Sequence, residues 1–322
     1  MTNNFKKFKQ LIKNTTKPIY IAGHINPDQD SICSSLALAR LLEKLGKEVY
    51  VLLENYDRFI LDTHNNTEHT TRLTKSDIVD NDYVFIALDL NETYRLGRFK
   101  QCFEQACLTI NIDHHQGNKT NANLVISETD KSSTCEIIYN LIMSYGSMYL
   151  DNNIANYLYA GIMTDTSCFA RRISPQTMTI AQKLINMGIC YEKIIKDTFS
   201  HRTLYELKAL ASLIDNIKYD ECLHYLVIDK SLPQYCELTH NQITKTIAEE
   251  LRKIEDMDIF LIFIIENNLI TAKSMSNVTK NAHLIAEHFG GGGHKGEAGF
   301  TVKNMTIEEI LQKTKEYLNK NN

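Results

Sequence analysis

Short apolar runs alternate with helical patterns through the first half of the chain, and this alternation constrains the fold more than any other feature. The apolar runs are "PIYIAG", "EVYVLL", "YVFIALD" and "LTINID", and the helical pattern "SICSSLALARLLEKLG" lies between the first two. Strands that alternate with helices in this way form a parallel sheet covered by helices. We therefore expect an α/β protein.

The chain of 322 residues is long for a single hydrophobic core, which favours two domains. Its second half contains the apolar runs "LHYLVI", "IFLIFIIE" and "LITAKSMS", and only "NN" separates the last two. This spacing predicts a small sheet with a hairpin, packed against helices. We expect a larger domain over 1–190, a helical connector over 191–216 and a smaller α/β domain over 217–322.

The composition is that of an ordinary globular protein, with 43% hydrophobic and 23% charged residues. The longest apolar run, "IFLIFII", is much shorter than the ~20 residues that cross a bilayer, and the N-terminus has no apolar signal core. We expect a cytoplasmic protein without a membrane partner. The formal net charge of -4 argues against broad contact with long duplex nucleic acid but not against a local phosphate pocket.

Acidic and imidazole side chains gather in four segments, and three of these segments follow a predicted strand. The segments are "GHINPDQDS", "ALDLNETYRLG", "NIDHHQGN" and "GIMTDTSCF". In open parallel sheets the ligand crevice lies outside the carboxyl ends of the strands, so these groups are candidates for a common site. Taken one at a time, Asp30, Asp89 and Asp165 are explained equally well as helix N-caps.

The four segments together are harder to explain as caps, because burial of several acids in one place is unfavourable unless cations compensate their charge. Carboxylates and imidazoles are suitable ligands for Mn, Co, Zn or Mg. Two such ions that share one carboxylate lower the pKa of a bridging water and stabilise the attacking and leaving oxygens of a displacement at phosphorus. The sequence thus predicts a two-metal site for phosphoryl chemistry.

The order of these motifs resembles the DHH phosphoesterases, a family named for the triplet found here as Asp113, His114 and His115. The resemblance implies an N-terminal Rossmann-like sheet, the metal-binding catalytic domain, and two divalent ions, with Mn²⁺ expected and Co²⁺ or Mg²⁺ as alternatives. It implies catalytic roles for Asp89, His115 and Asp113, with His115 facing the substrate phosphate and Asp113 orienting its neighbours. The metal ligands that it implies are His24, Asp28 and Asp89 for one ion, and Asp30, Asp89, His114 and Asp165 for the other.

The second strong motif is the glycine-rich segment "EHFGGGGHKGEAGF". It lies between an amphipathic helical pattern and the apolar "AGFTV", so it belongs inside a fold rather than to a linker. Glycine amides form concave nests for anions, and neighbouring histidine and lysine side chains add donors. The segment resembles that of the DHHA1 domain, which implies an active site in the interdomain cleft. The substrate-binding residues expected there are His115, Gly291, Gly292, Gly293, His294 and Lys295.

Together the motifs resemble those of the bifunctional oligoribonucleases and pAp phosphatases, the nanoRNase group. This resemblance implies a homodimer that cleaves short oligoribonucleotides such as pApA, or dephosphorylates 3′-phosphoadenosine 5′-phosphate (pAp), through a metal-bridging hydroxide. Some members split the linear dinucleotide from cyclic di-AMP. The residues alone do not decide among these substrates.

The sequence departs from the pattern of that group in two places. Ser276 stands where many relatives carry an arginine, and Lys273, Arg171 or Arg172 are candidates to replace it. The segment "GHINPDQDSICSS" is closer to the manganese-dependent family II inorganic pyrophosphatases, which are the alternative. The second domain of those enzymes uses an Arg-Lys-Lys type of motif, and this sequence has none.

Overall fold

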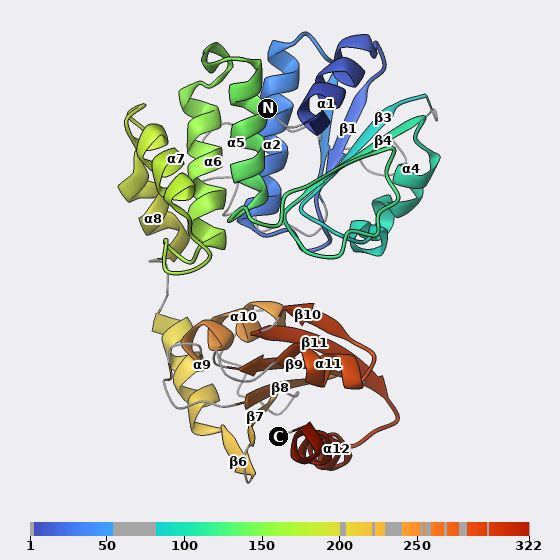
Figure 1. Cartoon of the computed structure of the whole chain (residues 1–322). Helices are drawn as coiled ribbons and strands as arrows, with labels where there is room; N and C mark the ends of the chain where they lie inside the picture. Colours follow the sequence, from blue (N-terminus) through green and yellow to red (C-terminus); the bar gives the residue numbers. More distant parts are fainter. Residues whose placement is uncertain are drawn as a thin grey trace. The chain divides into compact units, whose positions relative to one another are not determined.

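The chain forms two compact units, Met1–His201 and Arg202–Asn322, and each is described by itself (Figure 1). The boundary between them falls inside the predicted connector. The computed structural model describes residues 3–53, 82–199, 204–220, 223–228, 240–251, 254, 259–266, 269–276, 282–294 and 296–321.

The first unit is built on a sheet of five parallel strands, as the alternation of apolar runs predicts. The strand order is β2-β1-β3-β4-β5. The strands are β1 (Ile19–Ala22), β2 (Val49–Leu52), β3 (Val84–Leu88), β4 (Leu108–Asp113) and β5 (Leu124–Ser127). Because β1 pairs with both β2 and β3, the strand order reverses there, and the carboxyl ends of β1 and β3 lie where ligands bind in such sheets.

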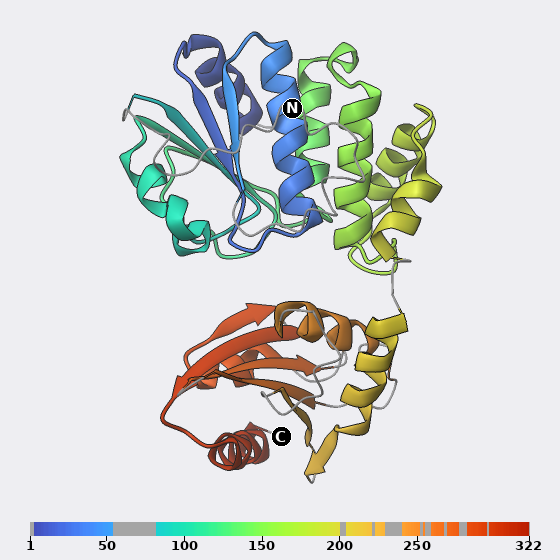
Figure 2. The same cartoon turned by 180° about the vertical axis from the view of Figure 1, so that it is seen from behind.

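Helices cover both faces of this sheet, which is why its strands are apolar on both sides. Alternate residues of β3 enter different cores: Val84, Ile86 and Leu88 face one, whereas Phe85 and Ala87 face the other. The first core includes residues of α1 (Asn3–Asn14), α2 (Gln29–Lys44), α5 (Thr134–Tyr145), α6 (Asn152–Asp165), α7 (Pro175–Ile185) and α8 (Tyr191–Phe199). The second includes residues of η3 (Thr93–Phe99) and α4 (Lys100–Gln105). Helices α2, α5 and α6 pack against one another (Figures 1 and 2).

The second unit is built on a mixed sheet with the order β10-β11-β9-β8-β7-β6. Only the β7–β8 pairing is parallel among its described strands, and β8 and β9 pair antiparallel as the hairpin pattern predicts. The strands are β6 (Lys218–Asp220), β7 (Leu223–Ile228), β8 (Ile259–Glu266), β9 (Leu269–Ser276), β10 (Gly292–His294) and β11 (Glu297–Lys303).

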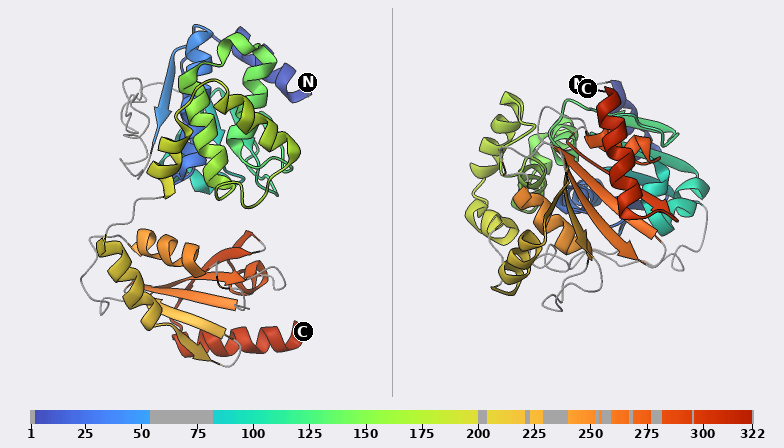
Figure 3. Two further views of the ribbon diagram at one scale, coloured as in Figure 1. Left: turned by 90° about the vertical axis from the view of Figure 1, so that its left-hand side faces the viewer. Right: turned by 90° about the horizontal axis from the view of Figure 1, so that it is seen from below.

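Helices also cover both faces of the second sheet. In β8, Ile259, Leu261 and Phe263 join a core with α11 (Ala282–His288) and α12 (Ile307–Asn321), and α12 lies across the strands (Figure 3). Phe260 and Ile262 point to the opposite core. That core includes α9 (Leu204–Asp215) and α10 (His240–Leu251). Each unit therefore has apolar cores of its own.

No helix in the described part of the chain combines the length and the apolar character of a membrane-spanning segment.

Candidate metal centre

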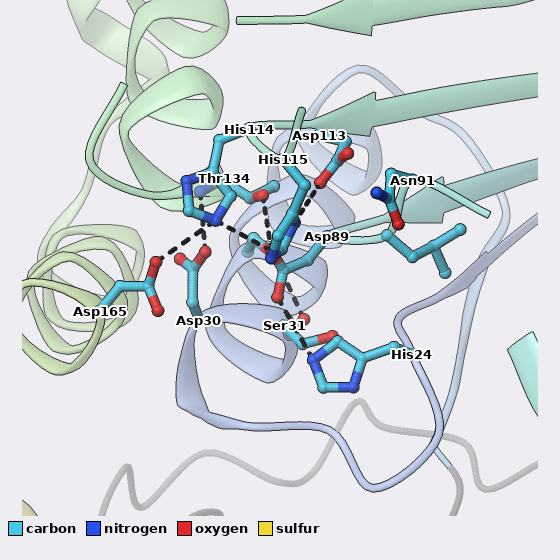
Figure 4. A network of polar contacts seen from close by, with 12 residues as sticks. His24, Asp30, Ser31, Asp89, Asn91, Asp113, His114, His115, Thr134 and Asp165 are labelled. Atoms are coloured by element: carbon cyan, nitrogen blue, oxygen red, sulfur yellow. Dashed lines mark hydrogen bonds and ion pairs between the residues drawn. The ribbon is translucent and has the colours of Figure 1, made fainter. Parts of the chain in front are cut away.

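The predicted metal ligands come together where β1, β3 and β4 end, beside the last turn of α6 (Figure 4). His24 follows β1, and Asp89 follows β3 directly. His114 follows β4, and Asp165 is the last residue of α6. Segments far apart in the sequence thus supply one cluster of acids and imidazoles.

His24, Asp28 and Asp89 form one group, whose candidate ligand atoms all lie within 4.8 Å of one another. The Nε2 atom of His24 is 3.8 Å from Oδ2 of Asp28 and 3.5 Å from Oδ2 of Asp89. The other ring nitrogen, Nδ1, lies 2.9 Å from the carbonyl oxygen of Ile25. A proton on Nδ1 is donated to that carbonyl, which leaves the Nε2 lone pair for a metal ion.

Asp30, His114 and Asp165 form a second group. The Nε2 atom of His114 is 3.3 Å from Oδ2 of Asp165 and 3.6 Å from Oδ1 of Asp89. Its Nδ1 atom is 3.4 Å from the carbonyl oxygen of Lys131, so this histidine is oriented in the same way as His24. Asp89 thus presents Oδ2 to the first group and Oδ1 to the second.

The backbone and one neighbouring hydroxyl hold Asp89 in this position. Its φ angle of 60° lies in the left-handed region, which aspartate tolerates better than most residues. Its N–H donates to the carbonyl oxygen of Ile112 over 3.0 Å, and the hydroxyl of Thr134 donates to its Oδ1 atom over 3.0 Å. Since Asp89 is only 2% exposed, its two carboxylate oxygens have fixed directions.

The start of α5 holds Asp30. The N–H groups of Thr134 and Cys135 donate to its two carboxylate oxygens over 2.7 and 3.0 Å. These amides have no partner within their own helix, and the helix dipole favours a negative charge there. A Cβ atom at Gly161 would come within 2.9 Å of Oδ1 of Asp30, so glycine at this position lets α6 approach the carboxylate.

His115 forms a third group of candidate ligands with Asp89 and His114, and it also pairs with Asp113. Asp113 is fully buried, and its Oδ1 atom is 2.7 Å from Nδ1 of His115. Burial opposes protonation of His115, but the hydrogen bond with Asp113 and the negative charges of Asp89 and Asp113 together outweigh it and raise the pKa of the ring. Within the described residues, Asp113 belongs to no group of candidate metal ligands. Its carboxylate orients His115 instead.

The cluster carries more negative charge than its histidines balance. Burial and the neighbouring charges, Asp89 first, raise the pKa of Asp30 well above its ordinary value. Burial and the charges of Asp28 and Asp89 raise the pKa of Asp165 to about 7. Such crowding of carboxylates and imidazoles fits divalent cations, which compensate the charge. Those ions would be held by His24, Asp28, Asp30, Asp89, His114 and Asp165.

The explanation of single acids as helix N-caps does not apply to the three for which it was considered. Asp30 lies in the first turn of α2, Asp165 ends α6, and Asp89 precedes the N-cap of η3. The N-cap of α2 is Asp28, whose Oδ1 atom accepts the N–H of Ser31 over 3.1 Å. Its Oδ2 atom faces His24, so one carboxylate caps a helix and joins the metal centre.

The sequence did not reveal the residues that hydrogen-bond to the candidate ligands or to the segments that carry them. Besides Thr134, the buried Glu136 accepts the hydroxyls of Ser132 over 2.6 Å and Thr177 over 2.9 Å through its Oε2 atom. It thereby ties α7 to the segment whose Lys131 carbonyl faces His114. The spacing of Ser133 and Glu136 in "SSTCE" is that of a helix start, and this signal could have placed Thr134 at the start of α5.

In the second unit, the glycine-rich segment ends α11 and forms β10. The N–H groups of Gly290 and Gly291 donate to the carbonyl oxygens of Glu287 and Ala286, so they complete the end of the helix. The Gly291 amide is therefore already used, although the sequence predicts it as a ligand contact. His294 ends β10, and Lys295 lies outside the described residues.

Packing explains two of the three predicted glycines. A Cβ atom at Gly291 would come within 2.6 Å of Cβ of Phe300, and one at Gly293 within 2.5 Å of Cα of Ala298. At Gly292 a Cβ atom would meet nothing within 4 Å. The fold thus requires glycine at the two outer positions, whereas Gly292 has space around it.

Ser276 and the residues considered as substitutes for the missing arginine have defined contacts. The hydroxyl of Ser276 accepts the N–H of Ala282 over 3.2 Å at the start of α11. Lys273 pairs with Glu297. Arg172 lies 3.3 Å from Oδ2 of Asp165 in the metal centre, and Arg171 is exposed.

Comparisons with known proteins match both units. The model of the DHH family, N-terminal domain, matches residues 18–162, and that of the DHHA1 domain matches residues 229–320. The chain is 27% identical over 313 residues to the bifunctional oligoribonuclease and PAP phosphatase NrnA of Thermus thermophilus, covering 95% of this chain and 91% of that protein.

Two solved structures share the fold. An exopolyphosphatase-related protein of Bacteroides fragilis matches with a TM-score of 0.86 and 20% identity over 99% of this chain and 98% of its own. RecJ of Thermus thermophilus in complex with Mn²⁺ matches with a TM-score of 0.61 and 13% identity, covering 98% of this chain and 54% of RecJ. With both family models matched in order along the chain, this protein belongs to the DHH family of phosphoesterases and carries a DHHA1 domain behind its DHH domain.

Proposed function

We propose that the protein is a two-metal phosphohydrolase that cleaves short oligoribonucleotides such as pApA and dephosphorylates pAp. The observation that carries the proposal is the pair of ligand groups on either side of Asp89, the arrangement needed for two ions that share one carboxylate. The name of the Thermus relative supports these substrates, and the Mn²⁺ in RecJ supports manganese as the metal.

The chain's own residues would position the phosphate and balance its charge. The bound ions would activate water at neutral pH and neutralise the charge that develops on the phosphate. His115 donates from Nδ1 to Asp113, which leaves its Nε2 side for the substrate. The hydrogen bond with Asp113 favours the protonated form of His115, and in that form Nε2 would donate a charge-assisted hydrogen bond to a phosphate oxygen.

The second unit would supply a phosphate-binding role of its own. We assign this role to Gly292, His294 and Lys295, since a bare amide, an imidazole and an ammonium group are donors for phosphate.

A competition assay tests the proposal. The protein receives Mn²⁺ with pAp, pApA and inorganic pyrophosphate together, and the products are separated by liquid chromatography. We expect AMP from pAp and pApA while pyrophosphate persists. Loss of pyrophosphate alone would overturn the proposal in favour of a family II type of pyrophosphatase.

The substitution Asp89→Asn tests the two-metal arrangement. We expect manganese occupancy to fall at both sites and turnover to be lost, because the amide cannot supply the negative charge that the two ions share. Asp82→Asn is the matched control, since Asp82 pairs with Lys17 at the surface. Manganese content by elemental analysis and circular dichroism separate metal loss from unfolding. Full occupancy with full turnover in Asp89→Asn would contradict the bridging role.

A further inference from the structure

Helix η3 lies directly beside the first metal ligand. The N–H of Ile25, the residue after His24, donates to the carbonyl oxygen of Arg95 in η3 over 2.6 Å. The positive charge of Arg95 also acts on His115. The segment around residue 95 therefore lies next to the loop that carries His24.

The core fixes which side of η3 faces solvent. Leu96 and Phe99 are each 1% exposed and pack in the core beneath the helix. Tyr94 is consequently turned outward and is 65% exposed, and Ile25 is 40% exposed on the other side of the hydrogen bond. The side chains of Tyr94 and Ile25 are thus exposed to solvent near the candidate metal centre.

The loop that leads into η3 is also held in place. The N–H of Lys119 donates to the carbonyl oxygen of Asn91 over 2.7 Å, and the amide of Asn91 donates to the carbonyl oxygen of Gln116 over 2.8 Å. Lys119 further pairs with Glu92 over 3.0 Å. A ring on such a supported segment loses little conformational freedom when it binds a ligand.

A nucleotide needs more than a phosphate site, because its base is a flat, largely apolar ring. Stacking of a base on an aromatic side chain contributes about 1–3 kcal/mol and tolerates any base. We propose that Tyr94, flanked by Ile25, is the stacking site for the base of the nucleotide whose phosphate lies at the metal centre. This inference rests on the proposed function, and it makes the centre selective for nucleotides over inorganic phosphates.

Kinetics on two substrates test the stacking site. The variants are Tyr94→Ala and Tyr94→Phe, and the substrates are pAp and its abasic analogue, in which hydrogen replaces adenine. For Tyr94→Ala we expect KM for pAp to rise about 5- to 150-fold with little change in kcat, and KM for the abasic analogue to stay unchanged. Tyr94→Phe should behave like the wild type, since it keeps the ring. Tyr219→Ala removes a tyrosine that is 66% exposed in the second unit and serves as the control.

Equal changes in KM for pAp and the abasic analogue, or no change for either, would overturn the stacking site. A separate measurement covers the case in which the proposed function fails and neither substrate is turned over. Binding of AMP and of ribose 5-phosphate to the manganese-loaded protein is then measured by calorimetry. Weaker binding of AMP alone in Tyr94→Ala supports the stacking site, and unchanged binding of both ligands refutes it.

Discussion

At the scale of single residues, Thr134 supports two of the candidate metal ligands, Asp89 and Asp30. Its hydroxyl donates to Asp89, and its N–H donates to Asp30. Partners that orient metal ligands typically contribute about 10- to 100-fold to metal affinity or activity. We expect Thr134→Val to weaken manganese binding within this range, because valine keeps the shape of threonine but leaves Asp89 without its donor.

The hydroxyl is the group under test, so Thr134→Ser should restore most of the manganese affinity. Thr179→Val is the matched control, because Thr179 is exposed and its hydroxyl donates only to the carbonyl oxygen of Pro175 in its own helix. Calorimetric titration with Mn²⁺ measures each variant. Equal affinities for the serine and valine variants would show that the hydroxyl does not position Asp89.

The sequence predicts residues in this centre well where strand ends impose the geometry, and poorly where support comes from a remote helix. His24 and Asp89 follow strands that pair with each other, so their proximity follows from the predicted parallel sheet. Thr134 reaches the centre because α5 begins there; the spacing of Ser133 and Glu136 marks the start of this helix but does not show that it lies beside β3. The left-handed backbone conformation of Asp89 could not be predicted from the sequence either. It accompanies a hydrogen bond from the N–H of Asp89 to the carbonyl oxygen of Ile112 on the neighbouring strand.

At the scale of elements, the N-cap of α6 links stability to pH. Burial raises the pKa of Asp151, but the N–H of Ile154 and the ammonium group of Lys44 outweigh it and hold the pKa below its ordinary value. A lowered pKa in the folded state means that the charged cap stabilises fully above the unfolded pKa and loses this effect as pH falls through the folded value. Asp151→Ala should therefore lower the free energy of unfolding by about 1 kcal/mol at neutral pH.

The difference between the wild type and Asp151→Ala should shrink in acid. Urea unfolding of the metal-free proteins across the acidic range measures it. Asp151→Asn is the control, because asparagine keeps a capping oxygen without the charge. A wild-type advantage over both variants that does not change with pH would contradict the charged cap.

In the glycine-rich segment, packing requires a glycine at position 291 but not at position 292. Gly291→Ala would force its new Cβ atom against Phe300 and should lower the free energy of unfolding by about 1–3 kcal/mol, as overpacking does. Gly292→Ala meets open space and should leave stability nearly unchanged. Thermal unfolding of the two variants makes the comparison, and equal destabilisation would show that both glycines serve the fold.

At the scale of the whole molecule, every candidate metal ligand in the described residues belongs to the first unit. A ligand stabilises only the unit that binds it, by about 2.7 kcal/mol at a hundredfold excess over Kd. We expect Mn²⁺ to raise the unfolding temperature of one calorimetric transition of the full-length chain and to leave the other in place. A joint shift of both transitions would show that the two units unfold together.

The architecture of both units could be predicted from the apolar runs in the sequence and from the distances between them. The apolar runs of the first unit are continuous because helices bury both faces of its strands, and the short gap between β8 and β9 leaves room only for a hairpin. The end of the first unit is harder to predict. Helices α8 and α9 both fall within the predicted connector, yet α8 belongs to the first unit and α9 to the second.

The crowding of carboxylates around Asp30 and Asp165 would couple the binding of a metal ion to the release of protons. Burial and the neighbouring carboxylates raise the pKa of Asp165 to about 7 and the pKa of Asp30 well above its ordinary value, which favours the protonated form of both groups in the metal-free protein. A divalent ion bound there would displace such protons, so we expect metal uptake to release protons and to weaken as the medium becomes acidic. The fraction of the protein with bound metal would therefore depend on pH as well as on the metal concentration.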